Sequence, residues 1–123
     1  MLGSRDVITF VATTDAAKAR QFYEAALGLR FVSDDRFALI FDANGTTLRV
    51  TKVRSFEPAE HTVLGWRVPD IDDAARDLSS RGVVFERYDG FSQDELGIWN
   101  APDGFRVAWF KDPDGNVLSL TQP

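Results

Sequence analysis

The chain contains no cysteine and a single histidine, His61. Without thiols it has no disulfides, zinc–thiolate sites, iron–sulfur clusters or thiol nucleophiles. It also lacks a long hydrophobic run, since none approaches the roughly 20 apolar residues that a membrane-spanning helix needs. The first residues do not show the basic and then apolar pattern of a secretory leader, so we expect a cytoplasmic protein with no membrane partner.

Positive charge is also scarce, because 14 Lys and Arg residues stand against 19 Asp and Glu residues, which gives a net charge of −5. The basic residues form no cluster of the kind that binds a phosphate backbone, so nucleic acid is not an expected partner. The rest of the composition is ordinary: of 123 residues, 44% are hydrophobic and 27% are charged. These values predict a single domain, residues 1–123, that is large enough to bury a core.

Two segments carry the signals of a helix. The first begins at Asp15, a residue type that caps helix N-termini, and ends at Gly28. The second begins at Asp70 and ends at Gly82, and Asp73 follows Asp70 at the spacing of a capping box. Each helical segment follows an alternating apolar segment that is typical of a strand.

The strand candidates repeat the same order in both halves of the chain, with one strand before the helix and further strands after it. An Asn44-Gly45 hairpin signal joins two of them. The repetition predicts an α+β fold of two βαβββ modules, at about 5–55 and 60–123, with an apolar concave sheet face. The strand candidates are residues 7–13, 29–34, 37–42, 46–53, 61–68, 83–90, 97–104, 105–112 and 116–122.

Three motifs occur in a fixed order along the chain: D-x6-FY-x3-LG at Asp15–Gly28, V-P-D-I-D-D-A-A-x-x-L-x-x-R-G-V at Val68–Val83, and D-P-D-G-N at Asp112–Asn116. In order and spacing they resemble the vicinal oxygen chelate superfamily, which includes glyoxalase I, bleomycin-resistance proteins and extradiol dioxygenases. The resemblance implies paired modules that form a cupped, incomplete β-barrel-like sheet. It also implies a homodimer and, in the enzymes of the family, a divalent metal ion in the cup.

The resemblance places the metal ligands seven residues before each helix-opening Asp and four residues after each turn glycine. Here these positions hold Ile8, Val63, Arg49 and Ser119. Ile and Val offer no lone pair, Arg stays protonated, and a single Ser hydroxyl is a poor ligand for a divalent ion. His61 alone does not make a site. We therefore expect no metal and no cofactor, and no metal-dependent glyoxalase or dioxygenase activity.

Side chains that alternate with these positions face the same way and define a pocket for a small-molecule ligand. A guanidinium at position 49 needs an anion, which is a ligand group or an internal carboxylate, unless the side chain reaches the rim. Trp99 and Trp109 offer stacking surfaces, whereas Trp66 is expected in the core. The candidate ligand-binding residues are Phe10, Arg49, His61, Arg67, Trp109 and Ser119.

The leading hypothesis is a protein that binds a small organic molecule, with an anion as one option, in the cupped sheet and does not transform it. One alternative is a lyase, isomerase or dioxygenase of the same superfamily with an unrecognised metal site or a metal-free site. Another is a protein that sequesters a cationic drug of the bleomycin type, because the net charge of −5 would attract it. Arg49 and Arg67 speak against the second alternative if both face inward.

Overall fold

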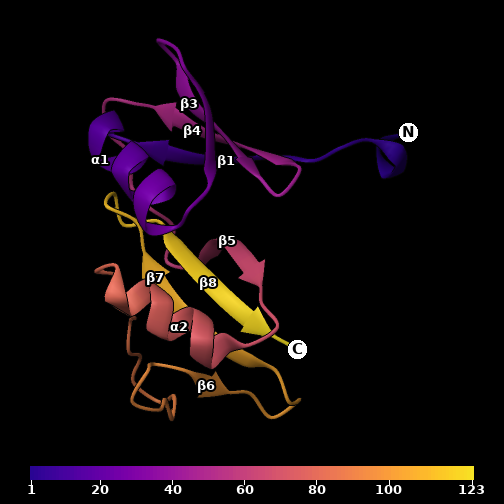
Figure 1. Ribbon diagram of the computed structural model, residues 1–123, viewed down its shortest axis with the longest axis vertical. Coiled ribbons are helices and arrows are strands. Elements are labelled where there is room, and N and C mark those ends of the chain that lie inside the picture. The colour runs from indigo at the N-terminus through magenta and orange to yellow at the C-terminus, as the bar shows by residue number, and fades with distance from the viewer. The chain divides into compact units, whose positions relative to one another are not determined.

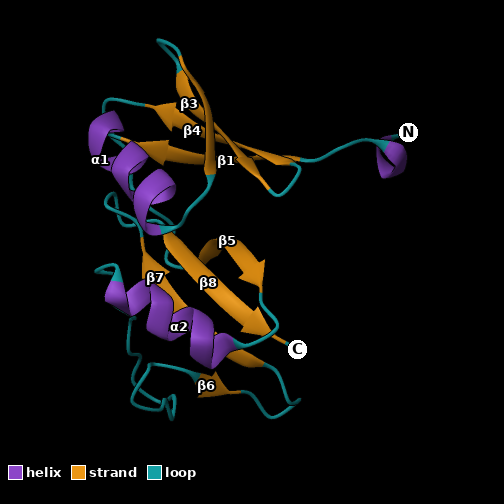
Figure 2. Cartoon of the chain, viewed as in Figure 1, coloured by secondary structure: helices purple, strands orange, loops and turns teal.

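The computed structural model describes all residues from 1 to 123 and divides the chain into two compact units, Met1–Glu57 (unit one) and Pro58–Pro123 (unit two). Each unit is described by itself. In both units a four-stranded mixed sheet carries a helix on one face (Figure 1; Figure 2). Both units follow the order βαβββ, so the predicted α+β fold is confirmed, and neither sheet closes on itself.

Unit one has the strand order β1-β4-β3-β2, in which β1 runs parallel to β4 and the other neighbours are antiparallel. The parallel β1–β4 pair requires a crossover, and the helical segment that follows β1 provides it. The elements are a 3-10 turn η1 (Leu2–Ser4), β1 (Ile8–Thr13), α1 (Ala16–Arg20), a π-helical segment η2 (Gln21–Ala26), β2 (Arg30–Asp34), β3 (Ala38–Ala43) and β4 (Thr46–Lys52).

The helix of unit one begins and ends where its capping residues predict. Asp15 Oδ1 accepts a hydrogen bond from the backbone N–H of Lys18 at 3.1 Å. Gly28 follows the last turn with a φ of +74°, a value that favours glycine. Between these caps the second half of the helix widens to π-helical hydrogen bonding at Gln21–Ala26, which the sequence does not announce.

The core of unit one lies between this helix and one face of its sheet. Tyr23 is completely buried, and its ring lies 5.9 Å from that of Phe41 in β3. Phe31 packs edge-on against Phe41 at 5.7 Å. The opposite face keeps apolar side chains in solvent, because Ile8 and Phe10 are 52% and 60% exposed. The sheet therefore has one fully used face and one that is largely open.

Unit two repeats the topology with the strand order β5-β8-β7-β6, and again the first strand pairs in parallel with the last. Asp70 Oδ1 caps the helix by accepting from the Asp73 N–H at 3.1 Å, and Gly82 ends it with a φ of +93°. The elements are β5 (Thr62–Arg67), α2 (Ile71–Ser80), β6 (Trp99–Asn100), β7 (Arg106–Lys111) and β8 (Val117–Gln122).

The core of unit two lies where α2 covers β7 and β8. Phe110 is completely buried there, with the Phe85 ring at 5.7 Å and the Trp66 ring stacked at 6.4 Å. Leu118 and Leu120 point to the same side of β8 and are buried as well. Trp66 thus packs on the helix-covered face of the sheet, as the strand alternation predicts.

The strand predicted at 83–90 is wrong, and the one predicted at 97–104 shrinks to β6. Phe85 forms one isolated bridge with Phe110, and the Glu86 N–H donates to the Trp109 carbonyl at 2.8 Å. Beyond this point the Gln93 side chain takes over the backbone groups of the segment. It accepts from the Tyr88 N–H at 2.8 Å and donates to the carbonyls of Glu86 and Gly97 at 2.9 and 2.8 Å. These groups are therefore unavailable for a ladder.

The D-P-D-G-N motif forms the turn between β7 and β8, and its first Asp organises it. Asp112 Oδ1 accepts from the N–H groups of Asp114 and Asn116 at 3.0 and 2.9 Å. Its Oδ2 accepts from the Asn116 side-chain amide at 2.8 Å. Both Asp112 and Asn116 are buried, at 6% and 5% exposure. The motif therefore serves the fold by fixing where β8 begins.

Replacing Asp112 by Ala should destabilise unit two by about 2 kcal/mol, because buried donors of the turn lose their acceptor. Urea denaturation followed by circular dichroism measures the change. Asp103→Ala in the other Pro-Asp-Gly turn is the matched control, since it removes one exposed bond to the Phe105 N–H. The control should change stability by no more than about 0.5 kcal/mol. Equal effects of the two substitutions would contradict the role given to Asp112.

No helix of the chain is long and apolar enough to cross a membrane.

Candidate ligand-binding groove

Two of the six predicted site residues, Phe10 and Arg49, belong to unit one. They are direct partners on β1 and β4, so both side chains leave the sheet on the same face. Arg49 is half-buried and forms no ion pair and no side-chain hydrogen bond within the chain. The pKa of Asp35 is lowered mainly by the N–H groups of Phe37 and Ala38, with a smaller contribution from the Arg49 charge. Arg49 thus has an acidic neighbour but no direct carboxylate partner.

Ser119 and Trp109 are cross-strand partners in unit two, and Gly65 is the partner of Ser119 on its other side. Ser119 is buried at 7% exposure, and its hydroxyl forms no hydrogen bond within the chain. A Cβ on Gly65 would lie 2.8 Å from the Ser119 Oγ, which is too close for an undisturbed side chain. The missing side chain of Gly65 therefore makes room for the hydroxyl at position 119.

The remaining predicted residues, His61 and Arg67, line two different hollows of unit two. Arg67 is exposed at the end of β5, where it contributes to a hollow of about 430 Å³ together with Gln122. His61 precedes β5, and its Nδ1 lies 3.1 Å from the Thr62 carbonyl oxygen. The strand count expects Val63 to face the pocket, but β5 shifts register here. Thr62 stands opposite Val117 of β8, and Val63 has no partner.

Four aromatic side chains gather on the face of unit two that α2 leaves uncovered; we call Tyr88, Phe91, Trp99 and Trp109 the aromatic cluster. The Phe91 ring lies 4.7 Å from Trp99 and 5.6 Å from Trp109. Tyr88 meets Trp109 edge-on at 5.5 Å, and the two Trp rings lie 5.9 Å apart. Each member contacts at least two others, so the four rings form a continuous surface.

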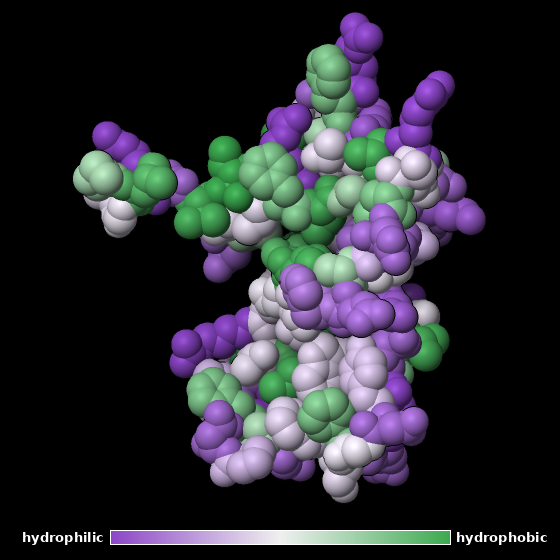
Figure 3. Space-filling view, turned by 180° about the vertical axis from the view of Figure 1, so that it is seen from behind, coloured by the Kyte–Doolittle hydropathy of each residue, from purple (hydrophilic) through white to green (hydrophobic).

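A groove of about 380 Å³ runs along the aromatic cluster, a volume within the usual range of small-molecule sites. We call it the aromatic groove. A second hollow of about 500 Å³ continues from it and shares Glu60, Tyr88 and Val117. In Figure 3 this unit presents pale side chains of intermediate hydropathy with a few hydrophobic ones between hydrophilic neighbours. The aromatic groove is lined by Glu60, His61, Thr62, Tyr88, Phe91, Trp109 and Val117.

The ionisable groups at the groove leave one carboxylate unpaired. Burial raises the pKa of the Tyr88 phenol, and the Glu86 charge raises it further, so the phenol stays neutral and able to donate a hydrogen bond. Lys111 Nζ lies 3.4 Å from Glu86 Oε1 in a half-exposed ion pair. Glu60 forms no ion pair with any residue of the chain. The groove thus combines flat apolar walls, a phenol, an imidazole and a free carboxylate.

A polar network places the segment that carries Phe91 and Trp99. Asp94 Oδ1 accepts from the N–H groups of Leu96 and Ile98, both at 2.9 Å, and the Ile98 side chain is completely buried. Ile98 directly precedes β6, so its burial fixes the start of the strand that presents Trp99. The sequence predicts only a polar loop at 88–97, because the three-way use of the Gln93 side chain has no local signature.

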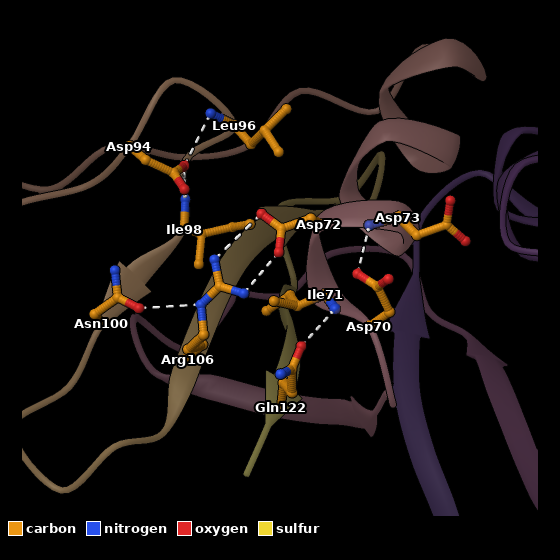
Figure 4. Close-up of polar contacts among 10 residues, drawn as sticks. All are labelled: Asp70, Ile71, Asp72, Asp73, Asp94, Leu96, Ile98, Asn100, Arg106 and Gln122. Carbon is orange, nitrogen blue, oxygen red and sulfur yellow. Dashed lines mark hydrogen bonds and ion pairs between the residues drawn. The ribbon is translucent and has the colours of Figure 1, made fainter.

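A second network joins the start of α2 to the strands beneath it (Figure 4). The Arg106 guanidinium donates to both oxygens of Asp72, at 2.7 and 3.2 Å, and its Nε donates to Asn100 at 3.0 Å. Gln122 Oε1 accepts from the Ile71 N–H at 2.8 Å. None of these residues lines the aromatic groove, so we assign the network to the stability of unit two.

The Asp72–Arg106 pair should make the stability of the chain depend on pH. The hydrogen bond from Arg106 lowers the pKa of Asp72 below its ordinary value of 3.8. The stabilisation is therefore present above that value and is lost as the pH falls through the lowered pKa. We expect the Asp72→Asn variant to be less stable than the wild type at neutral pH. In acid this difference in stability should become smaller.

Urea midpoints measured between neutral pH and strongly acidic pH check this expectation. Asp73→Asn is the matched control, because it removes a carboxylate from the same helical turn without touching Arg106. Its difference from the wild type should vary less with pH. Parallel curves for Asp72→Asn and the wild type at every pH would contradict the coupling.

Of the predicted site residues, Trp109 and His61 line the aromatic groove, and the sequence did not predict most of its other wall residues. Tyr88 and Phe91 lie in a segment whose polar composition indicates an ordinary surface loop. Glu60 directly precedes the only histidine, but one carboxylate beside one imidazole has no specific meaning in a sequence. Two aromatic residues inside a predicted polar loop were the only available signal.

The four positions to which the resemblance assigns metal ligands do not fit a divalent ion. Ile8 and Val63 are apolar and at least 41% exposed, and Arg49 carries a positive charge. No group of three or more His, Cys, Asp and Glu side chains gathers anywhere in the chain. The donor set therefore does not match the metal that the enzymes of the family use, and we derive no reaction step through one.

The sequence matches a known protein family, and the fold matches those of solved structures. The family model of the Glyoxalase/Bleomycin resistance protein/Dioxygenase superfamily matches residues 6–120. Lactoylglutathione lyase from Agrobacterium tumefaciens has the same fold, with a TM-score of 0.74, 16% identity and coverage of 97% of this chain and 93% of that one. No curated protein matches the sequence.

Two other solved structures are at least 25% identical to this chain. A member of the same superfamily from Sphaerobacter thermophilus DSM 20745 is 25% identical, with a TM-score of 0.72 and coverage of 95% of this chain and 97% of that one. TnmS3 from Streptomyces sp. CB03234, described as an antibiotic binding protein, is 27% identical. Its TM-score is 0.68, and the match covers 98% of both chains.

Proposed function

This chain belongs to the glyoxalase/bleomycin resistance protein/dioxygenase superfamily, and we propose that it binds a small organic molecule in the aromatic groove without a metal ion. The observation that carries the proposal is the open aromatic cluster beside a hollow of about 380 Å³. Aromatic side chains that serve only as core are covered, whereas Phe91 is 41% exposed. A flat ligand would cover such rings and bury apolar area on both sides.

Two further observations support binding in preference to metal-assisted catalysis. The residues at the positions of the family's metal ligands cannot hold a divalent cation, as described above. TnmS3, which is described as binding an antibiotic, matches 98% of this chain. Binding without turnover is therefore the function that the groove supports best.

Acridine, a neutral molecule of three fused rings, is a suitable probe. In the presence of a chelator it should quench the fluorescence of Trp99 and Trp109 to saturation, with one molecule bound per chain, because its rings fit against the cluster. Absence of saturable binding would sink the proposal. Binding that appears only after manganese, iron, nickel or zinc is added would show instead that a metal site was overlooked.

We also propose that the chain forms a homodimer. Support comes from apolar side chains that stay in solvent in β1 and directly before it: Ile8 and Phe10 are 52% and 60% exposed, and Val7 is 68% exposed. A protein interface would cover them. Sedimentation equilibrium should give twice the chain mass of 13.7 kDa, whereas a mass near 13.7 kDa at all concentrations would refute the dimer.

A further inference from the structure

We propose that the aromatic groove selects flat organic cations over neutral and anionic molecules of the same shape. This inference rests on the proposed function and adds the charge of the ligand to it. For this groove it replaces the sequence-based expectation of an anionic ligand and agrees in ligand charge with the second alternative given there, a cationic drug. That expectation depended on Arg49, which belongs to unit one. Arg67, the other arginine predicted to lie in the pocket, lines a different hollow of unit two.

The net negative charge of the chain is concentrated in unit two, which carries the aromatic groove. Unit one has 8 basic and 7 acidic residues, a net charge of +1, whereas unit two has 6 basic and 12 acidic residues, a net charge of −6. A cation approaching unit two therefore meets an attractive field, and an anion meets a repulsive one. The field by itself gives no specific site, so the groups at the groove have to supply it.

Most cations near the groove are already engaged by the protein. Lys111 pairs with Glu86, and the Arg87 guanidinium donates to the Glu95 carbonyl at 3.0 Å. Glu60 lines both the aromatic groove and its continuation and has no cationic partner. A positively charged ligand in the groove would give this carboxylate its only ion pair. An anionic ligand would lie beside it without compensation.

The aromatic cluster favours the same ligand charge. The face of an aromatic ring attracts a cation within about 6 Å of its centre, and Trp binds more strongly than Tyr or Phe. Tyr88, Phe91 and Trp109 all line the groove, and none of them is covered by a cationic side chain of this protein. Rings and carboxylate together form the kind of cage that recognises a delocalised or quaternary cation.

Ser119 adds a polar contact at the floor of the same face. Its side chain is more than nine-tenths buried, forms no hydrogen bond within the chain, and leaves the sheet beside Trp109. Because Gly65 has no side chain, β5 leaves room for this hydroxyl. A ligand substituent that accepts a hydrogen bond would give the Ser119 hydroxyl a partner.

Three acridines that share the same fused rings and differ in charge through the substituent at position 9 test the proposal: 9-aminoacridine as the cation, acridine as the neutral molecule and acridine-9-carboxylate as the anion. Affinities come from quenching of tryptophan fluorescence in a mildly alkaline buffer. We expect the cation to bind about tenfold more tightly than acridine, a difference that an unpaired carboxylate and ring faces together can supply. Added salt should weaken binding of the cation and leave acridine nearly unchanged.

Glu60→Gln should reduce the affinity for 9-aminoacridine about three- to tenfold and leave the affinity for acridine unchanged. Glu95→Gln is the matched control, because Glu95 carries the same charge in unit two but does not line the groove. An equal loss of affinity in both variants would show that Glu60 acts only through the net charge of unit two. That result would overturn the proposed contact.

The outcomes separate this inference from the proposed function. Equal affinity for cation and neutral probe, or tighter binding of the anion, overturns the inference and leaves small-molecule binding intact. Failure of all three probes to bind refutes both proposals. Tight binding of the cation that the Glu60→Gln substitution does not weaken leaves the rings as the only source of selectivity and contradicts the role of the carboxylate.

Discussion

Replacing Trp109 by Ala is expected to weaken binding of acridine about 10- to 100-fold, because stacking on one aromatic side chain contributes about 1–3 kcal/mol. Trp109 contacts all three other members of the aromatic cluster, with ring distances of 5.5, 5.6 and 5.9 Å. Its loss removes one wall of the groove and also the support of Tyr88 and Phe91. Calorimetric titration measures the effect without relying on the fluorescence that the substitution removes.

The control for this prediction is Trp66→Phe. Trp66 stacks on Phe110 under α2, on the opposite face of the sheet, and does not line the groove. The control variant should bind acridine as the wild type does. A Trp109→Ala variant that retains its circular dichroism spectrum and binds acridine with unchanged affinity would place the ligand elsewhere.

The largest effect on stability is expected for Phe110→Ala, at about 3–5 kcal/mol. The side chain is completely buried, and its ring is in contact with Trp66 and Phe85. Because domains of this size are stable by only about 5–15 kcal/mol, the variant is expected to lose a large share of its free energy of unfolding. Urea denaturation followed by near-ultraviolet circular dichroism reports on the aromatic core of unit two.

Two further variants keep this prediction testable if Phe110→Ala does not fold. Phe110→Leu fills most of the space and should cost about 1–2 kcal/mol, less than the full truncation. Phe105→Ala removes the same side chain at a position that is 41% exposed and should change stability far less. Equal losses at positions 105 and 110 would contradict the described core.

The sequence predicts the repeated architecture well because its signals are local. A helix needs a cap at each end, and Asp15, Gly28, Asp70 and Gly82 provide it within a few residues of chain. Strands such as Ala38–Ala43 are recognisable because they are apolar and flanked by turn residues. Because both halves show the same order of strands and helix, the fold class can be predicted without knowledge of any long-range contact.

The segment after α2 escapes prediction because its structure depends on contacts that are not local in pattern. Residues 83–90 contain the β-branched and aromatic residues of a strand, yet the Gln93 side chain binds the backbone groups that a ladder would use. In consequence Tyr88 and Phe91 face the groove from an irregular segment. Side chains do not alternate regularly in such a segment, so the sequence does not predict the direction of either ring.

The candidate site was partly predictable for a similar reason. Ser119 and Trp109, two of the predicted site residues, lie on regular strands and are cross-strand partners on one face of the sheet. A count along β5 loses its register at Val63, because the register shift brings Thr62 opposite Val117 and leaves Val63 without a partner. The unpaired state of Glu60 depends on where every cation of unit two lies, which only the folded chain determines.

The central claim is that the aromatic groove of unit two binds a small molecule without a metal ion. The chemical shifts of the backbone amides and the tryptophan indole N–H groups test it most directly. They are recorded on the ¹⁵N-labelled full chain while acridine is added in the presence of a chelator. The account predicts that the largest changes occur at His61, Thr62, Tyr88, Phe91 and the Trp109 indole. Changes centred on other residues, or none until a divalent metal is supplied, would contradict it.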